Sequence, residues 1–270
     1  MPTAQLSPGI TNTLTAEWTK LRSVRSTWTV VAAAAVVSVG FSALFSMLTE
    51  ADYRNLPAGQ RVDFDAAGTS MVGMNLGLIL VSVLGVLAVS GEYSTGMMRL
   101  TLAITPRRGR VLLAKAVVVG LLTFVLGTLF ATAAFHSGQL ILGLDPDIPT
   151  LGLDGPGVVR SLLGWGAEMA AFALLALSFG VIMRSAAGAI ATAIGFIFAP
   201  AILGALLPAW VQRDILAYFP ASAAEQLSTA QLKTDAATYL GPLTGGGVLL
   251  TWVSIVLMVA FSLMGKRDSG

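Results

Sequence analysis

The stretch VVRSLLGWGAEMAAFALLALSFGVIM, at residues 158–183, is the clearest indication of the fold. Only two of its residues, Arg160 and Glu168, are charged, and most of the others are apolar. An α-helix rises about 1.5 Å per residue, so roughly 20 apolar residues reach across the hydrocarbon core of a bilayer. The stretch is therefore predicted to cross a membrane as an α-helix.

Five other stretches have the same apolar character, and the composition of the whole chain agrees with them. They are residues 28–48, 71–90, 111–135, 186–207 (with Pro200 as a predicted kink) and 243–264. Of the 270 residues 55% are hydrophobic and only 11% are charged, whereas soluble domains contain about 25% charged residues. We predict an all-α integral membrane protein with six transmembrane helices in a single domain over residues 1–270.

The basic residues set the predicted orientation. Six spans within residues 28–264 place the segments 1–27 and 265–270 on the same side of the membrane. Eleven of the sixteen Lys and Arg residues fall on that side, and loops rich in Lys and Arg stay in the cytoplasm. Both termini are therefore predicted to be cytoplasmic.

Residues 14–28, before the first span, have helical spacing. The apolar stripe of this segment comprises Leu14, Trp18 and Leu21, while Lys20 and Arg22 lie on other sides. A basic helix with Trp on its apolar side suits the plane of the lipid headgroups, so we predict an interfacial helix. The alternative is a cytosolic extension of the first span.

A longer polar segment, residues 208–242, separates the last two spans on the predicted outer side. Pro208 and Pro220 bracket one amphipathic piece, and Ser222 followed by Glu225 has the spacing of a capping box. We predict two short helices at the outer surface. The alternative is an extended polar loop.

Catalytic motifs are mostly absent from the sequence. There is no G-x-x-x-x-G-K-[ST], so the chain does not bind ATP by a P-loop, and there is no H-E-x-x-H or G-x-S-x-G. The chain has no cysteine and one histidine, His136, which cannot form a metal cluster alone. We predict a protein that is not an enzyme and that carries no metal or cofactor of its own.

Glu168 is the one acidic residue well inside a predicted span, on a helical face shared with Arg160 and Gly164. Placing a charge at such a depth costs about 2.5–3.5 kcal/mol on insertion scales, so the side chain should face protein or water. We assign Glu168, with Asn75 of the second span, to a substrate pathway. The alternative is a structural carboxylate.

Small residues recur at helical spacing in two spans. Gly73 and Gly77 form a G-x-x-x-G near the start of the second span, and Gly188, Thr192 and Gly195 form a similar pattern in the fifth. Such spacing lets helix backbones approach closely. We predict tight helix contacts at both places.

The most informative segment lies on the cytoplasmic side, between the second and third spans: GEYSTGMMRLTLAITPRRGR, residues 91–110. Met98 and Leu102 would form the apolar side of a short helix with Arg99 opposite, and Pro106 would end it. Such a helix is suited to docking on a partner at the inner surface. The alternative is an ordinary basic inner loop.

Two groups of residues resemble those of a known family. The opening Glu17-Trp18-Thr19-Lys20-Leu21-Arg22-Ser23 is similar to that of permease subunits of type-2 ATP-binding-cassette (ABC) transporters, notably bacterial drug exporters. So are Glu92-Tyr93, with Gly96, Arg99 and Leu102, followed by Pro106, Arg108 and Lys115. The resemblance covers essentially the whole chain, and it departs at Met97, where the family more often has Thr.

The resemblance implies a mechanism and a set of partners. Two permease subunits, identical or related, would form the pathway in a bacterial plasma membrane for a hydrophobic or amphipathic small molecule, peptide or lipid. Separate ATPase subunits, carrying ATP and Mg²⁺, would bind a coupling helix at about residues 94–103. The implied coupling residues are Glu92, Tyr93, Gly96, Arg99, Leu102, Pro106 and Arg108. No nucleic-acid partner is expected.

Two other functions stay open on the residues alone. One is a secondary transporter or channel that works without ATP, although such proteins usually show inverted repeats or several buried ionisable residues. The other is a membrane anchor that recruits a cytosolic partner and transports nothing. Substrate-stimulated ATP hydrolysis by a complex with an ATPase would separate both from the permease.

Overall fold

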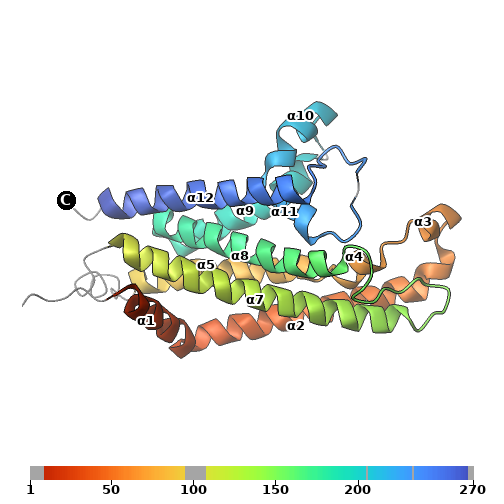
Figure 1. Cartoon of the computed structure of the whole chain (residues 1–270), viewed down its shortest axis with the longest axis horizontal. Helices are drawn as coiled ribbons and strands as arrows, with labels where there is room; N and C mark the ends of the chain where they lie inside the picture. Colours follow the sequence, from red (N-terminus) through yellow and green to blue (C-terminus); the bar gives the residue numbers. More distant parts are fainter. Residues whose placement is uncertain (1–8, 95–107, 205, 233, 267–270) are drawn as a thin grey trace, which may run out of the picture.

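The computed structural model describes residues 9–94, 108–204, 206–232 and 234–266. Every regular element in this part of the chain is a helix. Six helices are long and apolar enough to cross a membrane, and they run along the long axis of the molecule (Figure 1). They are α2 (Arg25–Asp52), α5 (Met74–Ser94), α7 (Arg108–Leu142), α8 (Val158–Met183), α9 (Ala186–Gly204) and α12 (Pro242–Lys266). The prediction of an all-α membrane protein with six spans is confirmed.

Helix α7 continues seven residues beyond its predicted end, because its polar side chains find partners inside the protein. Gln139 donates hydrogen bonds to the backbone oxygen of Ala66 and to Ser70 Oγ, and accepts one from the backbone N–H of Leu151. These bonds remove the cost of burying an amide within the bundle. The polar residues after Phe135 therefore extend the helix instead of ending it.

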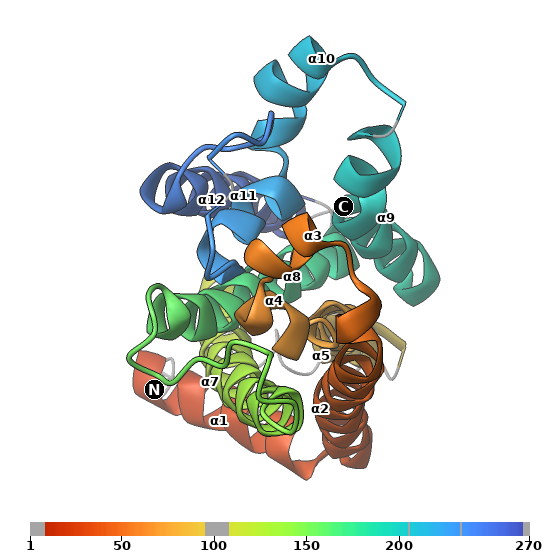
Figure 2. The same cartoon turned by 90° about the vertical axis from the view of Figure 1, so that its right-hand side faces the viewer.

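Helix α8 lies at the centre of the bundle, with α5, α7, α9 and α12 around it (Figure 2). It is the most deeply buried of the six spans, and α9 is the least buried. Most residues of α8 are buried, whereas Ala189 and Ala193 are the buried residues of α9. The central helix thus carries Glu168 among protein neighbours rather than lipid.

The small residues at the start of α5, Gly77 within it and Gly73 directly before it, make the tight contacts that their spacing predicts. A side chain at Gly73 or Gly77 would overlap Ser38 or Ser42 of α2, and the hydroxyl of Ser42 accepts a hydrogen bond from the N–H of Gly73. In the fifth span a Cβ at Gly188 would meet Met183 of α8, but nothing in the described chain lies within 4 Å of a Cβ built at Gly195, so close packing at Gly195 stays a prediction.

The N-terminal segment folds as α1 (Ile10–Ser23), which is followed directly by α2 and packs against α7. Its buried face comprises Thr13, Glu17 and Leu21, while 40% of Trp18 is exposed. Of the predicted apolar stripe, Leu21 packs inside the protein and Trp18 stays on the surface, while Glu17 is buried beside Lys115 of α7. The interfacial role of α1 stays a prediction.

Short helices gather at the opposite end of the bundle (Figure 1). They are η1 (Tyr53–Asn55), α3 (Ala58–Val62), α4 (Ala66–Ser70), α10 (Ala209–Asp214), η2 (Leu216–Tyr218) and α11 (Pro220–Ser228). The prediction of short helices between the last two spans is confirmed, but the predicted capping box is wrong. Helix α11 begins at Pro220, whose fixed φ and missing N–H suit the first helical position, so Ser222 lies inside the helix.

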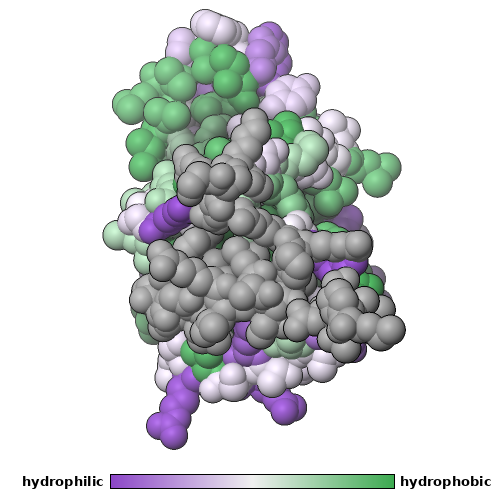
Figure 3. Space-filling view, turned by 90° about the vertical axis from the view of Figure 1, so that its left-hand side faces the viewer, coloured by the Kyte–Doolittle hydropathy of each residue, from purple (hydrophilic) through white to green (hydrophobic). Residues whose placement is uncertain are grey.

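The first and last described helices, α1 and the end of α12, lie at the same end of the bundle, here called the α1 end (Figure 1). The other end is called the α11 end. Viewed onto the α1 end, the surface shows a hydrophobic region in its upper part and hydrophilic side chains along its lower edge (Figure 3).

The orientation of the chain across the membrane can be tested by cysteine labelling. The chain has no cysteine, so an introduced cysteine would be its single reactive thiol. Ser23 and Asp235 are exposed at opposite ends, so Ser23→Cys and Asp235→Cys provide matched single-cysteine reporters. In intact cells a membrane-impermeant maleimide is expected to label Asp235→Cys and to leave Ser23→Cys unlabelled until the cells are permeabilised. Labelling in the reverse pattern would contradict the predicted cytoplasmic location of the termini.

Candidate functional site

Four charged side chains meet where α1, α5 and α7 converge at the α1 end. Lys115 Nζ lies 2.5 Å from Glu17 Oε2 and 3.0 Å from Glu92 Oε1. Lys20 Nζ lies 2.7 Å from Glu17 Oε1 and 3.0 Å from Glu92 Oε1. Each carboxylate thus bridges both ammonium groups, and the four charges sum to zero. We call these four residues the ion cluster.

The two lysines of the ion cluster differ in burial. Only 3% of the Lys115 side chain is exposed, against 26% of the Lys20 side chain. Burial by itself would lower the pKa of Lys20, but the hydrogen bonds and charges of Glu17 and Glu92 outweigh it and raise the pKa. Lys20 is therefore held as a cation, and Lys115, the more buried of the two, has Glu17 and Glu92 as its charged partners.

The structure places part of the predicted coupling site. Glu92 belongs to the ion cluster, Tyr93 lies in the last turn of α5, and Arg108 is the first residue of α7. Lys20, predicted for the interfacial helix, also joins the cluster, whereas Arg22 is exposed. The predicted residues Gly96, Arg99, Leu102 and Pro106 lie outside the described residues, as does the predicted coupling helix except for Ser94, which ends α5.

Sequence reasoning assigns neither Glu17 nor Lys115 to a site, although both belong to the segments that carry the resemblance. A signal for Lys115 is present, because it is the only charged residue in the apolar stretch 111–135. Glu17 gives no such signal, since it lies in a polar segment. Its burial depends on a lysine 98 positions later in the chain.

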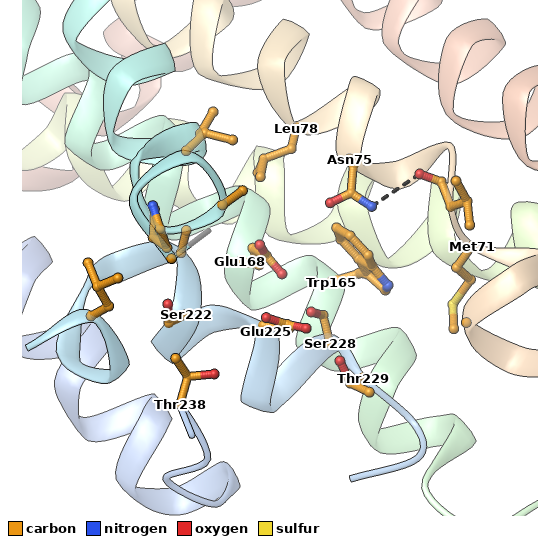
Figure 4. A pocket seen from close by; sticks show the side chains of 18 of the residues that line it. Met71, Asn75, Leu78, Trp165, Glu168, Ser222, Glu225, Ser228, Thr229 and Thr238 are labelled. Atoms are coloured by element: carbon orange, nitrogen blue, oxygen red, sulfur yellow. Dashed lines mark hydrogen bonds between the residues drawn. The ribbon is translucent and has the colours of Figure 1, made fainter. Parts of the chain in front are cut away.

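A cavity of about 640 Å³ lies toward the α11 end, between α5, α8, α9 and α11. Both residues predicted for the substrate pathway, Glu168 and Asn75, line it. In Figure 4 their side chains extend into the same space from α8 and α5. The structure therefore brings the two residues together, and their role in transport stays a prediction.

Glu168 is 5% exposed, and its Oε2 has no hydrogen-bond partner within the described part of the chain. Arg160, on the same helical face, does not pair with it. The guanidinium of Arg160 instead donates to four backbone oxygens near the end of α11, those of Gln226, Leu227, Thr229 and Ala230. This arginine thus stabilises the carboxyl end of a helix, where the exposed carbonyl groups favour a cation.

The same face of α8 positions α11 as a wall of the cavity. Ser161 donates a hydrogen bond to the backbone oxygen of Ser228. A Cβ at Gly164 would overlap the backbone of Leu227, so α11 can approach α8 this closely only because residue 164 is glycine. On this face of α8, Arg160 and Gly164 therefore hold α11 in place, and Glu168 lines the cavity that α11 borders.

Comparisons with known proteins bear on both regions. A family model described as "ABC-2 family transporter protein" matches residues 13–204, well over half of the chain. No curated protein matches the chain. The matched residues include the whole ion cluster and, in the cavity, Asn75 and Glu168. The chain therefore belongs to the ABC-2 family and is a permease subunit of an ABC transporter.

Proposed function

We propose that this permease subunit works with a second permease subunit in the plasma membrane of a bacterium and exports a hydrophobic or amphipathic substrate. Separate ATPase subunits, which bind ATP and Mg²⁺, dock at its α1 end on the cytoplasmic side. The absence of a P-loop in the chain supports a separate energy source. The resemblance to drug exporters supports the direction of transport.

The observation that carries the proposal is the ion cluster. The segment between α5 and α7 is the one that the family resemblance assigns to ATPase docking, and the cluster joins both of these helices to α1. Breaking a buried ion pair by removing one partner costs about 3–5 kcal/mol. A displacement of residues 95–107 by a bound ATPase would therefore move α1, α5 and α7 together rather than bend one helix alone.

Helix α5 connects the ion cluster with the cavity. Glu92 lies near its carboxyl end and Asn75 near its amino end, about 26 Å apart along the helix axis. Between them Gly85 packs so closely on the backbone of Ala173 that a Cβ would overlap it. A displacement of α5 at the α1 end would thus be transmitted to α8 and to the cavity wall.

Co-expression with an ATPase encoded beside the permease gene tests the proposal. We expect the two proteins to purify as a complex whose ATP hydrolysis responds to substrate. Arg99→Glu, in the proposed docking segment, is expected to lower the amount of co-purified ATPase at least tenfold without preventing membrane insertion. Arg61→Glu, at the exposed helix α3 of the other end, is the matched charge reversal and should leave the complex intact.

The other outcomes identify the competing functions. A complex that forms but whose hydrolysis responds to no transport condition would favour a membrane anchor. Transport that proceeds without any ATPase would favour a secondary transporter or channel. Equal complex formation by Arg99→Glu and Arg61→Glu would contradict the docking assignment.

A further inference from the structure

We propose that the cavity around Glu168 binds an organic cation with an apolar body, and that the Glu168 carboxylate pairs with the positive charge. This inference names a substrate class for the proposed exporter and so rests on the proposed function. The proposal is argued from the shape and charge of the cavity, all of whose described lining residues belong to this chain.

The charge of the cavity is one-sided. Asp65, Glu168 and Glu225 line it, and none of its described lining residues is basic. Two arginines on the helices that border it have other partners: Arg160 of α8 binds the carbonyls at the end of α11, and Arg213 of α10 pairs with Asp214 at 2.8 Å. Among the described lining residues, a cationic ligand would therefore meet acidic and neutral side chains and no basic one.

The three carboxylates are not equivalent. Asp65 Oδ1 accepts a hydrogen bond from the N–H of Gly68 and caps α4, and Glu225 is exposed to solvent. Glu168 is buried, its Oε2 has no partner in the described chain, and its carboxylate points into the cavity (Figure 4). A buried polar atom without a partner is costly, and a ligand that donates to it or pairs with it removes that cost.

The remaining walls suit an apolar body. Trp165, Met71, Leu78, Ile197 and Leu216 line the cavity, and an indole face attracts a cation as well as apolar groups. The Nδ2 of Asn75 donates to the backbone oxygen of Val72, and its amide oxygen points the other way in Figure 4. The cavity thus combines aromatic and aliphatic surface with a few oxygen acceptors.

Size and geometry favour an organic cation over a metal ion. A volume of about 640 Å³ lies within the range of about 300–1,000 Å³ that is typical of pockets for drug-sized ligands. No group of three or more His, Cys, Asp or Glu residues in the described chain converges as metal ligands would. The carboxylates therefore border a cavity of ligand size and do not converge on one position as the ligands of a metal ion do.

The test compares two ions of the same shape and opposite charge on the purified permease in lipid nanodiscs, with empty nanodiscs subtracted. The probes are tetraphenylphosphonium and tetraphenylborate, and equilibrium dialysis measures their binding. We expect saturable binding of the cation only. Glu168→Gln keeps the size of the side chain and should weaken the cation at least tenfold, whereas Asp154→Asn, an exposed carboxylate outside the cavity, should leave the affinity unchanged.

Two results would overturn the proposal: equal saturable binding of both ions, or wild-type affinity for the cation in Glu168→Gln. The comparison of the two probes uses the unmodified protein, so it decides the matter even if Glu168→Gln does not fold. No ATPase takes part in the measurement. A failure here would therefore leave the docking proposal standing, and a failure of ATPase docking would leave cation binding to be judged on its own.

Discussion

Replacing Lys115 with methionine is expected to release α1 from α5 and α7 and to destabilise the protein by about 3–5 kcal/mol. Methionine has a similar length but no charge, so Glu17 and Glu92 would lose the more buried of their two cations. Lys20 could not replace it, because it already binds the same two carboxylates from the more exposed side. Transport driven by the ATPase should be lost when the ion cluster no longer connects α1, α5 and α7.

The chain offers a matched control in Lys20→Met. Lys20 and Lys115 bind the same carboxylates at similar distances, but 26% of the Lys20 side chain is exposed against 3% for Lys115. Solvent reaches Lys20 and can replace part of its pairing, as it does for ion pairs nearer the surface, so Lys20→Met should have a smaller effect than Lys115→Met. Thermal unfolding in detergent and co-purification with the ATPase measure both variants.

A double mutant separates the ion pair from simple loss of packing. Lys115→Met leaves two carboxylates with one lysine, and adding Glu17→Gln removes the excess negative charge, so part of the lost stability should return. Equal destabilisation by Lys20→Met and Lys115→Met, or a double mutant whose losses simply add, would show that the ion cluster does not hold α1 in place.

The sequence predicts the six spans well because each depends on local information, namely the length and apolarity of one segment. The predicted ends of α8 coincide with the observed ones, where Gly157 and Arg184 adopt the left-handed conformation and stop the helix at both sides. The end of α7 is missed because it depends on the contacts of Gln139 with α4, which are distant in the sequence.

The same distinction applies to the candidate sites. Glu168 can be found from the sequence because a carboxylate inside an apolar span is unusual wherever it occurs. Its position beside Asn75 of α5 and Glu225 of α11 depends on how these two helices pack against α8, which no local pattern reveals. Glu17 and Lys115 are missed for a related reason. Burying either charge is costly, and the ion pair between them, which offsets that cost, joins residues far apart in the sequence.

Gly164→Ala is expected to destabilise the protein and to weaken cation binding together, although it adds a single methyl group. The new Cβ would overlap the backbone of Leu227, and backbone cannot move aside as a flexible side chain can. Overpacking of this kind costs about 1–3 kcal/mol. A displaced α11 would in addition weaken the bonds of Arg160 and Ser161 to its last carbonyls, and the cavity would lose the wall that carries Glu225.

Gly40→Ala supplies a control whose effect should have the opposite sign. Gly40 is an exposed residue of α2, and nothing lies within 4 Å of a Cβ built there. Alanine favours a helix over glycine by about 0.8–1.0 kcal/mol, so Gly40→Ala should be at least as stable as the wild type. Thermal unfolding and tetraphenylphosphonium binding measure both variants. If Gly164→Ala matched Gly40→Ala in both measurements, α11 could not depend on the close approach at residue 164, and the cavity would have to be shaped by α5, α8 and α9 alone.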